Sequence, residues 1–363
     1  MYLCDVTLRE GDQMPGRNYT EAQKVAAGRA LDRLGVDAIQ PGFPVTGEKD
    51  VRVTRTLADE CEADVVALAR AVSGDVDAAL DAEADVVEVF GALSSLQLEH
   101  ALGTDRETMF ERFDAAIERV RDGGATPHLT LVDAFRTERE HLVAAFERYP
   151  DLPMVTLADT VGVRTPASLR HDLTALGEGV DLARVGVHLH DDLGCATANA
   201  LVAHEVGVGK ADVSVASLGE RAGNPAVEEV VIAGVLEYGE SFGVTAADLV
   251  PACRTVLAAL EESVPPRKAI LGSEVMEHES GIHTAAMLRE PRTFEPFDPG
   301  AFGAERRLVF GAGTGRSGAR QLLERAGADA DEETVAAYLD RLAAEGPLDT
   351  EEAVDLARRE FAS

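Results

Sequence analysis

Two histidines one residue apart, His188 and His190, are the residues whose type and spacing point most directly to chemistry. They close a short apolar segment, residues 184–190 (RVGVHLH), which has the pattern of a β-strand. Side chains alternate between the two faces of a strand, so both imidazoles are expected to project to the same side. Two imidazoles directed at one point provide half of a divalent-metal site, whereas a solvated surface pair is the other interpretation of this spacing.

A carboxylate that would complete such a site lies far away in the sequence. Arg9 and Glu10 follow another apolar segment, residues 2–8 (YLCDVTL). Glu10 with His188 and His190 would form a three-ligand face that leaves positions open for a substrate. Mixed nitrogen and oxygen ligands suit Zn, Mn, Co or Mg, and a 2-oxo acid would chelate the same ion through its ketone and carboxylate oxygens.

Two further side chains are candidates for the same site. Arg9 is always charged, so it is suited to hold the oxygen of a developing enolate or alkoxide, although an ion pair with Glu10 would also explain it. Asn224 follows a glycine turn in residues 219–224 (GERAGN) and is expected to reach the metal directly or through water.

The rest of the chain has to bring these distant residues together, and its pattern indicates how. Strands are predicted at residues 2–8, 36–40, 64–69, 85–90, 127–132, 153–158, 184–190 and 211–216. Helices are predicted at residues 20–34, 48–60, 75–83, 104–122, 137–148, 166–177, 195–206 and 225–238. This α/β alternation implies a parallel sheet, and its length of about 240 residues matches a (β/α)8 TIM barrel, whose active site lies at the carboxyl ends of the strands. A doubly wound open sheet is the alternative, but residues 9–13 (REGDQ) do not form the glycine-rich turn expected there.

The alternation stops after residue 240, which predicts two domains. We expect a catalytic barrel over residues 1–262, and a small, mostly helical C-terminal lid subdomain over residues 263–363 without a regulatory domain after it. The second part contains HESGIH at residues 278–283, a glycine-rich loop at 311–318, and helical patterns near 318–327, 332–344 and 350–360.

The composition is strongly acidic, with a net charge of −31 and only four lysines among 34 basic residues. An acidic surface repels nucleic acid and anionic membranes, so neither is expected as a partner. The composition predicts a cytoplasmic protein of a high-salt, haloarchaeal-type cell, with an acidic mesophile as the alternative. The four cysteines are dispersed, and no leader peptide or membrane-spanning run is apparent, so we expect a soluble protein without disulfides.

Several segments together resemble the signature motifs of the 2-isopropylmalate, homocitrate and citramalate synthase family. They are residues 7–13 (TLREGDQ), 158–162 (ADTVG), 188–194 (HLHDDLG), 219–224 (GERAGN) and 280–283 (SGIH). The resemblance covers most of the chain and implies a metal-dependent acyltransferase that condenses acetyl-CoA with a small 2-oxo acid in branched-chain amino-acid or lysine biosynthesis. The lid of this family tends to reach the barrel of the partner subunit, which implies a homodimer.

The resemblance also implies a role for each candidate residue. The implied metal ligands are Glu10, His188 and His190, with Asn224 close to the metal. The implied catalytic residues are Arg9, which steadies the substrate and the acetyl enolate, and His283, which deprotonates the acetyl methyl group. The implied substrate-binding residues are Gln13, His128, Thr130 and Thr160, the last of which binds the carboxylate of the oxo acid.

The sequence departs from the family pattern at four positions. They are Phe294 in place of a tyrosine, Val132 in place of a glutamate, Gln97 in place of a histidine, and His128 where homocitrate synthases have an arginine. The missing arginine disfavours a long dicarboxylate, but pyruvate, 2-oxoisovalerate and 2-oxoglutarate all stay open. Two other functions compete: a hydroxymethylglutaryl-CoA-lyase-like lyase or aldolase, and a catalytically silent paralogue that binds CoA or an oxo acid. Residues 219–229 (GERAGNPAVEE) lack the cysteine of the lyases, whereas Phe294 and Val132 motivate the silent paralogue.

Overall fold

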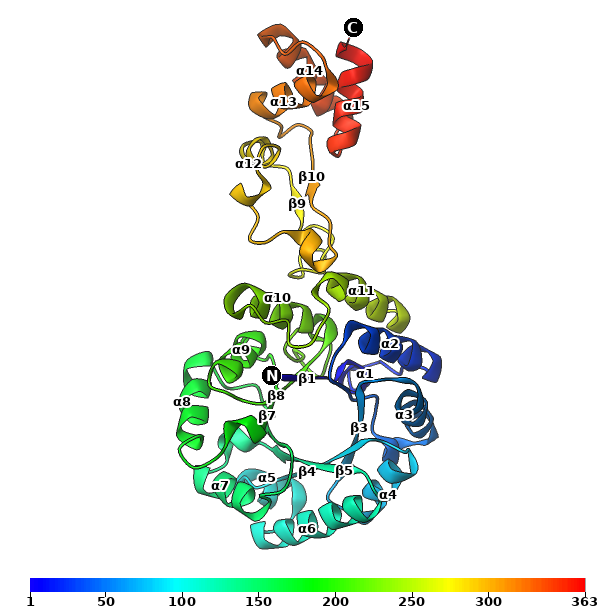
Figure 1. Ribbon diagram of the computed structural model, residues 1–363, viewed down its shortest axis with the longest axis vertical. Coiled ribbons are helices and arrows are strands. Elements are labelled where there is room, and N and C mark those ends of the chain that lie inside the picture. The colour runs from blue at the N-terminus through cyan, green and yellow to red at the C-terminus, as the bar shows by residue number, and fades with distance from the viewer. Residues whose placement is uncertain (363) are drawn as a thin grey trace. The chain divides into compact units, whose positions relative to one another are not determined.

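The computed structural model describes residues 1–362 (Figure 1). The chain forms two compact units, residues 1–263 and residues 264–363. None of the described helices is both long and apolar enough to cross a membrane. All of the candidate site residues belong to the first unit except His283, which belongs to the second.

The first unit is a closed barrel of eight parallel strands. The strands are β1 (Tyr2–Asp5), β2 (Ala38–Ile39), β3 (Asp64–Arg70), β4 (Val86–Ala92), β5 (Thr126–Val132), β6 (Val155–Asp159), β7 (Val185–Leu189) and β8 (Lys210–Val213). Each strand pairs with the next, and β8 closes on β1 with Tyr2 opposite Lys210. The predicted (β/α)8 TIM barrel is therefore confirmed, and the carboxyl ends of all the strands meet at one rim.

A ring of helices surrounds the strands (Figure 1). The main helices are α2 (Glu21–Leu34), α3 (Glu48–Glu60), α4 (Ser73–Asp81), α6 (Arg106–Asp122), α7 (Arg139–Arg148), α8 (Pro166–Leu176), α9 (Ala196–Glu205), α10 (Val227–Tyr238) and α11 (Leu249–Leu260), with the short helices α1 (Thr7–Asp12) and α5 (Ser95–Gln97). Local sequence sets their ends: α2 begins at a capping box of Thr20 and Gln23 and ends at Gly35, which has a left-handed φ of 90°. The side chains of Leu31 and Leu34, on the apolar face of this helix, are completely buried.

The first strand is shorter than the sequence predicts. The apolar run predicts a strand over residues 2–8, but β1 ends at Asp5 and helix α1 begins at Thr7. The Asp5 carboxylate accepts a hydrogen bond from the Thr7 amide at 2.9 Å, and the Glu10 amide donates to the carbonyl four residues before it at 2.8 Å. As a result, a helical turn rather than a strand end carries Arg9 and Glu10.

The barrel interior contains a cluster of charged side chains. Glu88 on β4 and both Lys210 and Asp212 on β8 are at most 2% exposed. The Nζ atom of Lys210 lies 3.2 Å from Glu88 Oε1 and 3.1 Å from Asp212 Oδ1. Buried charges are tolerated when they are paired in this way, and the pairing explains how ionised residues occupy strands that read as core.

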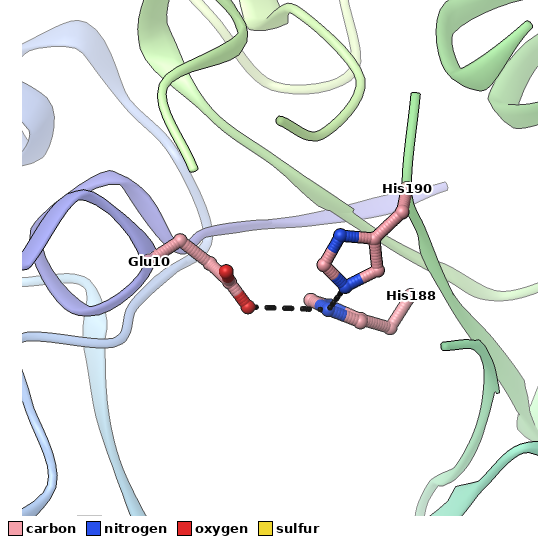
Figure 2. Close-up of side chains that lie close together, drawn as sticks. All are labelled: Glu10, His188 and His190. Carbon is pink, nitrogen blue, oxygen red and sulfur yellow. Dashed lines mark hydrogen bonds and ion pairs between the residues drawn. The ribbon is translucent and has the colours of Figure 1, made fainter. Parts of the chain in front are cut away.

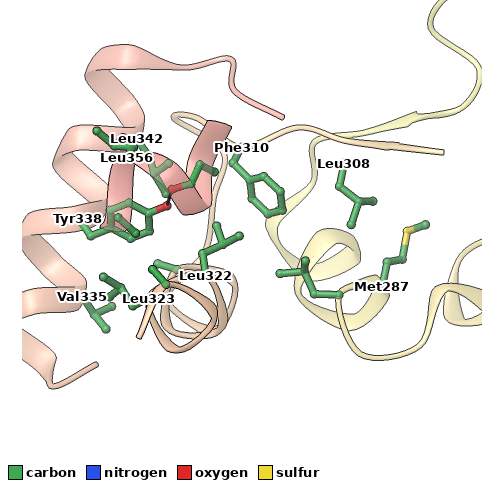
Figure 3. Packing of buried hydrophobic residues seen from close by; sticks show 14 residues of the cluster. Met287, Leu308, Phe310, Leu322, Leu323, Val335, Tyr338, Leu342 and Leu356 are labelled. Atoms are coloured by element: carbon green, nitrogen blue, oxygen red, sulfur yellow. Dashed lines mark hydrogen bonds between the residues drawn. The ribbon is translucent and has the colours of Figure 1, made fainter. Parts of the chain in front are cut away.

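The second unit is mostly helical, as the sequence predicts for the C-terminal part. Its elements are β9 (Glu277–His278), α12 (Gly281–Met287), β10 (Arg307–Leu308), α13 (Arg316–Ala326), α14 (Glu332–Glu345) and α15 (Thr350–Phe361). Helices α13, α14 and α15 share an apolar core with Phe310, in which Tyr338 donates its hydroxyl to the Ala353 carbonyl at 2.6 Å (Figure 3). Helix α12 was not predicted, because its start in a glycine-rich polar segment hides the helical pattern.

Candidate metal centre

Glu10, His188 and His190 come together in the structure (Figure 2). One ligand atom of each lies within 4.8 Å of the other two, and all three side chains are buried. The Nε2 atom of His188 is 3.3 Å from Glu10 Oε1 and 3.3 Å from His190 Nε2. Three atoms able to bind a metal therefore face one point, while their use as ligands stays a prediction.

The two imidazoles converge because of strand geometry. His188 lies on β7, and His190 is the first residue after that strand ends at Leu189, so the two keep the alternation of an extended chain. Their ring centroids are 5.1 Å apart and the rings meet edge to face at 78°. Glu10 arrives from α1, whose strand β1 is separated from β7 only by β8.

The electrostatics of the centre favour a cation. Burial opposes the charged form of Glu10, but the Arg9 guanidinium and His188 outweigh it and hold the pKa of Glu10 below its usual range. Burial would also lower the pKa of His188, yet hydrogen bonds with Asp212 and Glu10 raise the pKa of His188 to about 9. Burial and the charge of His188 lower the pKa of His190 to about 4. The charged imidazole of His188 thus lies between two carboxylates, Glu10 and Asp212, and a divalent ion could take over its role beside Glu10.

Asn224 adds an oxygen to this region. Its side chain is fully buried, and its Nδ2 atom donates to the Leu189 carbonyl at 3.0 Å. Its Oδ1 atom has no hydrogen-bond partner among residues 1–362, which is costly for a buried amide unless a further group engages it. Gly219 leaves room for this oxygen, because a Cβ atom there would overlap it. A carboxylate, two imidazoles and an amide oxygen form a donor set that fits Zn, Mn, Co or Mg.

Arg9 has partners on two sides. Its Nη1 atom contacts Glu10 Oε1, and its Nε and Nη2 atoms donate to Gln40 Oε1 at 3.1 and 2.9 Å. Gln40 in turn donates to Glu88 Oε2 at 2.6 Å. The ion pair considered from the sequence therefore exists. A guanidinium has five N–H groups, however, so Arg9 keeps donors for a substrate oxygen as well.

Sequence reasoning missed the residues that support the histidine pair from the barrel interior. The Oδ2 atom of Asp212 lies 2.9 Å from His188 Nδ1, which turns Nε2 of that imidazole toward Glu10. Asp212 is paired in turn with Lys210. The one sequence signal for this set is the presence of charged residues inside otherwise apolar strands, at Glu88, Lys210 and Asp212.

Comparison with known proteins decides the family. The HMGL-like model matches residues 1–251, and the model described as homocitrate synthase post-HMGL domain-like matches residues 270–346. The chain belongs to the HMGL-like family. Its relatives include the synthases whose motifs the sequence resembles, so the family assignment made from those motifs is confirmed.

Curated relatives within the family cover nearly the whole chain. The chain is 42% identical to the homocitrate synthase AksA of Methanopyrus kandleri, over 95% of this chain and 87% of the relative. It is 36% identical to the homocitrate synthase AksA of Methanosarcina mazei, over 94% of this chain and 84% of the relative. It is 34% identical to the 2-isopropylmalate synthase of Methanocaldococcus jannaschii, over 87% of this chain and 61% of the relative.

Solved structures share the barrel of this HMGL-like protein. The HMG-CoA lyase of Bacillus subtilis superposes with a TM-score of 0.65 at 20% identity, over 73% of this chain and 95% of that chain. The lyase of Pseudomonas aeruginosa superposes with a TM-score of 0.62 at 24% identity, over 72% and 93% of the two chains. At these identities the likeness shows the fold alone.

The residues that the resemblance assigns to the substrate lie on three elements of the barrel. His128 and Thr130 lie two residues apart on β5 and so share a face, with the Thr130 hydroxyl donating to the buried carboxylate of β4. Thr160 follows β6, and its Oγ1 atom accepts the Asp133 amide at 2.8 Å. Gln13 caps the end of α1 and is exposed. Their roles in binding stay predictions.

His283 belongs to the second unit, on helix α12. Its imidazole stacks on the ring of Phe294, with centroids 3.9 Å apart and an angle of 24° between the planes. Phe294 supports the imidazole through ring contact alone, because it lacks the hydroxyl of the tyrosine that the family pattern has at this position.

Proposed function

We propose that this protein is an acyltransferase that joins acetyl-CoA to a 2-oxo acid and releases CoA and a 2-alkylmalate-type product. The new bond forms between the acetyl methyl carbon, which loses a proton, and the ketone carbon, whose oxygen gains one; water then cleaves the thioester. The observation that carries the proposal is the convergence of Glu10, His188 and His190 in a chain whose curated relatives are named homocitrate and 2-isopropylmalate synthases.

The proposed cofactor is a divalent metal ion. Glu10, His188 and His190 would hold it, and the unpartnered Oδ1 atom of Asn224 is a further oxygen for it. A bound ion of this kind supplies a Lewis acid for the ketone of the oxo acid. Asp212 accepts a hydrogen bond from Nδ1 of His188 and so directs Nε2 of that ring to the ion, which Nε2 would bind after giving up its own proton. These ligands fit Mn, Zn, Co and Mg alike.

Side chains of the protein handle the substrate oxygens and the proton in this proposal. Arg9 holds the oxygen of the acetyl enolate. The Thr160 hydroxyl accepts the Asp133 amide, so its own O–H is available to donate to the carboxylate of the oxo acid. Gln13 contacts the substrate from the exposed end of α1. His283 removes the methyl proton, a role that rests on the family motif around it.

The barrel interior favours an oxo acid with an uncharged side chain. Burial and the nearby charge of Lys210 lower the pKa of His128 to about 4, so this imidazole is neutral at pH 7. The Lys210 ammonium is engaged by Glu88 and Asp212, and Thr130 donates to Glu88. The described interior therefore offers no uncompensated cation to a second carboxylate. Although the relative with 42% identity is named a homocitrate synthase, we infer pyruvate or 2-oxoisovalerate rather than 2-oxoglutarate.

We also propose that the protein works as a cytoplasmic homodimer in a high-salt cell. Exposed apolar side chains occur in segments that follow strands of the barrel: Leu96, Leu102, Val163 and Leu193 are 49%, 42%, 43% and 56% exposed. A second copy that covers them would remove this apolar surface from water. A net charge of −31 repels itself unless salt screens it, which supports the high-salt setting.

A thiol-release assay tests the proposal. The protein in molar KCl is given acetyl-CoA and pyruvate, 2-oxoisovalerate or 2-oxoglutarate in turn, with Mn²⁺, Zn²⁺, Co²⁺ or Mg²⁺. We expect oxo-acid-dependent release of CoA that is fastest with an uncharged side chain. Absence of release under all these conditions contradicts the condensation, and a preference for 2-oxoglutarate contradicts only the substrate class. Cleavage of hydroxymethylglutaryl-CoA instead would identify a lyase.

A further inference from the structure

We propose that Lys210 is a positioning residue that fixes a metal-binding histidine and Arg9 at the same time. It does so as one member of a closed ring of side chains inside the barrel. The ring runs through Arg9, Gln40, Glu88, Lys210, Asp212, His188 and Glu10 and returns to Arg9. The inference rests on the proposed use of Glu10 and His188 as metal ligands.

One half of the ring leads from Lys210 to the metal centre. The Nζ atom of Lys210 lies 3.1 Å from Asp212 Oδ1, and Asp212 Oδ2 lies 2.9 Å from His188 Nδ1. The opposite ring nitrogen of His188 lies 3.3 Å from Glu10, the contact drawn in Figure 2. Lys210 therefore sets the position of the carboxylate that orients this imidazole.

The other half leads from Lys210 to the side chain that is proposed to hold the enolate. The Nζ atom lies 3.2 and 3.4 Å from the two oxygens of Glu88. Glu88 Oε2 accepts from Gln40 Nε2 at 2.6 Å, and Gln40 Oε1 accepts from Arg9 at 2.9 Å. The same ammonium thus anchors the chain of contacts that holds the guanidinium beside Glu10.

The barrel is built to admit this lysine. Three groups from different strands surround its ammonium: Glu88 and the Thr156 hydroxyl accept hydrogen bonds from it, the latter at 3.2 Å, and Asp212 forms an ion pair with it. Gly186 stands opposite Lys210 on β7, and a Cβ atom there would lie 3.2 Å from Lys210 Cδ and 2.7 Å from Thr156 Oγ1. The aliphatic part of the Lys210 side chain therefore packs against β7 at a glycine, where no side chain competes for the space.

The choice of lysine is itself informative. Only four of the 34 basic residues are lysines, so arginine is the usual cation of this chain. A compact ammonium can contact Glu88, Asp212 and Thr156, which come from three different strands. The planar guanidinium of arginine is better suited to a two-point contact with a single carboxylate. Without this cation, Glu88 would lose the ammonium that it pairs with and Asp212 would be left with His188 alone, so neither carboxylate would keep its position.

The variant Lys210→Met tests the proposal through cobalt binding, with Co²⁺ as the probe. We expect Co²⁺ to bind at least about 10-fold more weakly, as for the loss of a group that orients a metal ligand, and the visible spectrum of the bound ion to shift. Wild-type affinity together with a wild-type spectrum would overturn the proposal. Neither readout needs turnover, so failure of the condensation assay is distinguishable from failure of this inference.

Lys24→Met is the matched control for the loss of a buried lysine. Lys24 is fully buried and paired with Asp12 and Asp50, and Asp12 keeps Lys49 as a second partner at 2.8 Å. We expect this variant to lower the melting temperature and to leave the affinity and spectrum of Co²⁺ unchanged. An equal loss of Co²⁺ binding in both lysine variants would contradict a specific role for Lys210.

Two further variants keep the test decisive if Lys210→Met does not fold. Gly186→Ala crowds both the Thr156 hydroxyl that accepts from Lys210 and the lysine stem without removing the charge, so it should weaken Co²⁺ binding in the same direction. Lys210→Met combined with Glu88→Gln restores the charge balance but not the link, so the melting temperature should recover while Co²⁺ affinity stays low. Recovery of both in the double variant would show that Lys210 acts through charge balance alone and would overturn the proposal.

Discussion

Replacing Asp212 by Asn should weaken metal binding without unfolding the barrel. In the wild-type protein, His188 Nδ1 lies 2.9 Å from Asp212 Oδ2. An Asn side chain keeps an oxygen that can accept this hydrogen bond, but it lacks the negative charge. Two full charges about 4 Å apart interact by roughly 4 kcal/mol at an effective dielectric constant of about 20, which gives the scale of the attraction that the variant removes. Loss of a group that orients a metal ligand costs typically 10–100-fold in affinity, or about 1.4–2.7 kcal/mol. Because the hydrogen bond is retained, we expect a value near the lower end of that range.

The effect is measured by competition between the protein and a chromophoric chelator for Zn²⁺ or Mn²⁺. Asp75→Asn is the control, because Asp75 is another buried carboxylate of the barrel and pairs with Arg70 at 2.6 Å, away from the metal centre. We expect Asp212→Asn to lower affinity about 10-fold and Asp75→Asn to leave it unchanged. Equal affinity in wild type and Asp212→Asn would refute the idea that this carboxylate orients His188.

Further outcomes follow from the same structure. Burial raises the pKa of Asp5 to about 7 from 3.8, so the folded protein holds this proton more tightly than the unfolded chain, and stability falls as pH rises between those values. Asp5→Asn should therefore raise the free energy of unfolding by up to about 4 kcal/mol at pH 7 and above, with no gain near pH 4, in urea titrations; equal gains at both pH values would contradict this. Phe294→Tyr keeps the ring stacked on His283 and adds the missing hydroxyl, so kcat should rise with little change in KM for the oxo acid. A fall in kcat would count against the proposed role of His283 in removing the methyl proton. The melting temperature should rise steeply with KCl because the net charge is −31, and a flat curve up to molar salt would contradict the high-salt adaptation.

The order of the elements could be predicted because it depends on local patterns. Helices at residues 48–60 and 332–344 match α3 and α14 within a residue, since apolar spacing and the residues at their ends mark them directly. The end of β1 could not be predicted, because residues 7 and 8 continue an apolar run although the chain has already turned into α1.

One part of the candidate metal centre could be predicted from the sequence, and another part could not. The convergence of His188 and His190 follows from the alternation of a strand, which is a local property. The pairing of Lys210 with Glu88 joins residues that are 122 apart in sequence, and it depends on how the closed barrel directs side chains inward. A strand pattern predicts that a residue such as Lys210 is buried, but it does not predict which side chain that residue contacts. The residues that hold His188 in place could therefore be identified only from the fold.

The proposed reaction forms a carbon–carbon bond at a metal that Glu10, His188 and His190 are proposed to hold. The most direct measurement supplies acetyl-CoA labelled with ¹³C in its methyl carbon, together with pyruvate or 2-oxoisovalerate and Mn²⁺, and follows the label by NMR. We predict that the labelled methyl carbon becomes the methylene carbon of citramalate or 2-isopropylmalate, and that chelation of the metal or His190→Ala abolishes this signal. Label that stays in acetyl-CoA or appears only in acetate with every oxo acid, or a product that forms equally well in His190→Ala, would contradict the claim.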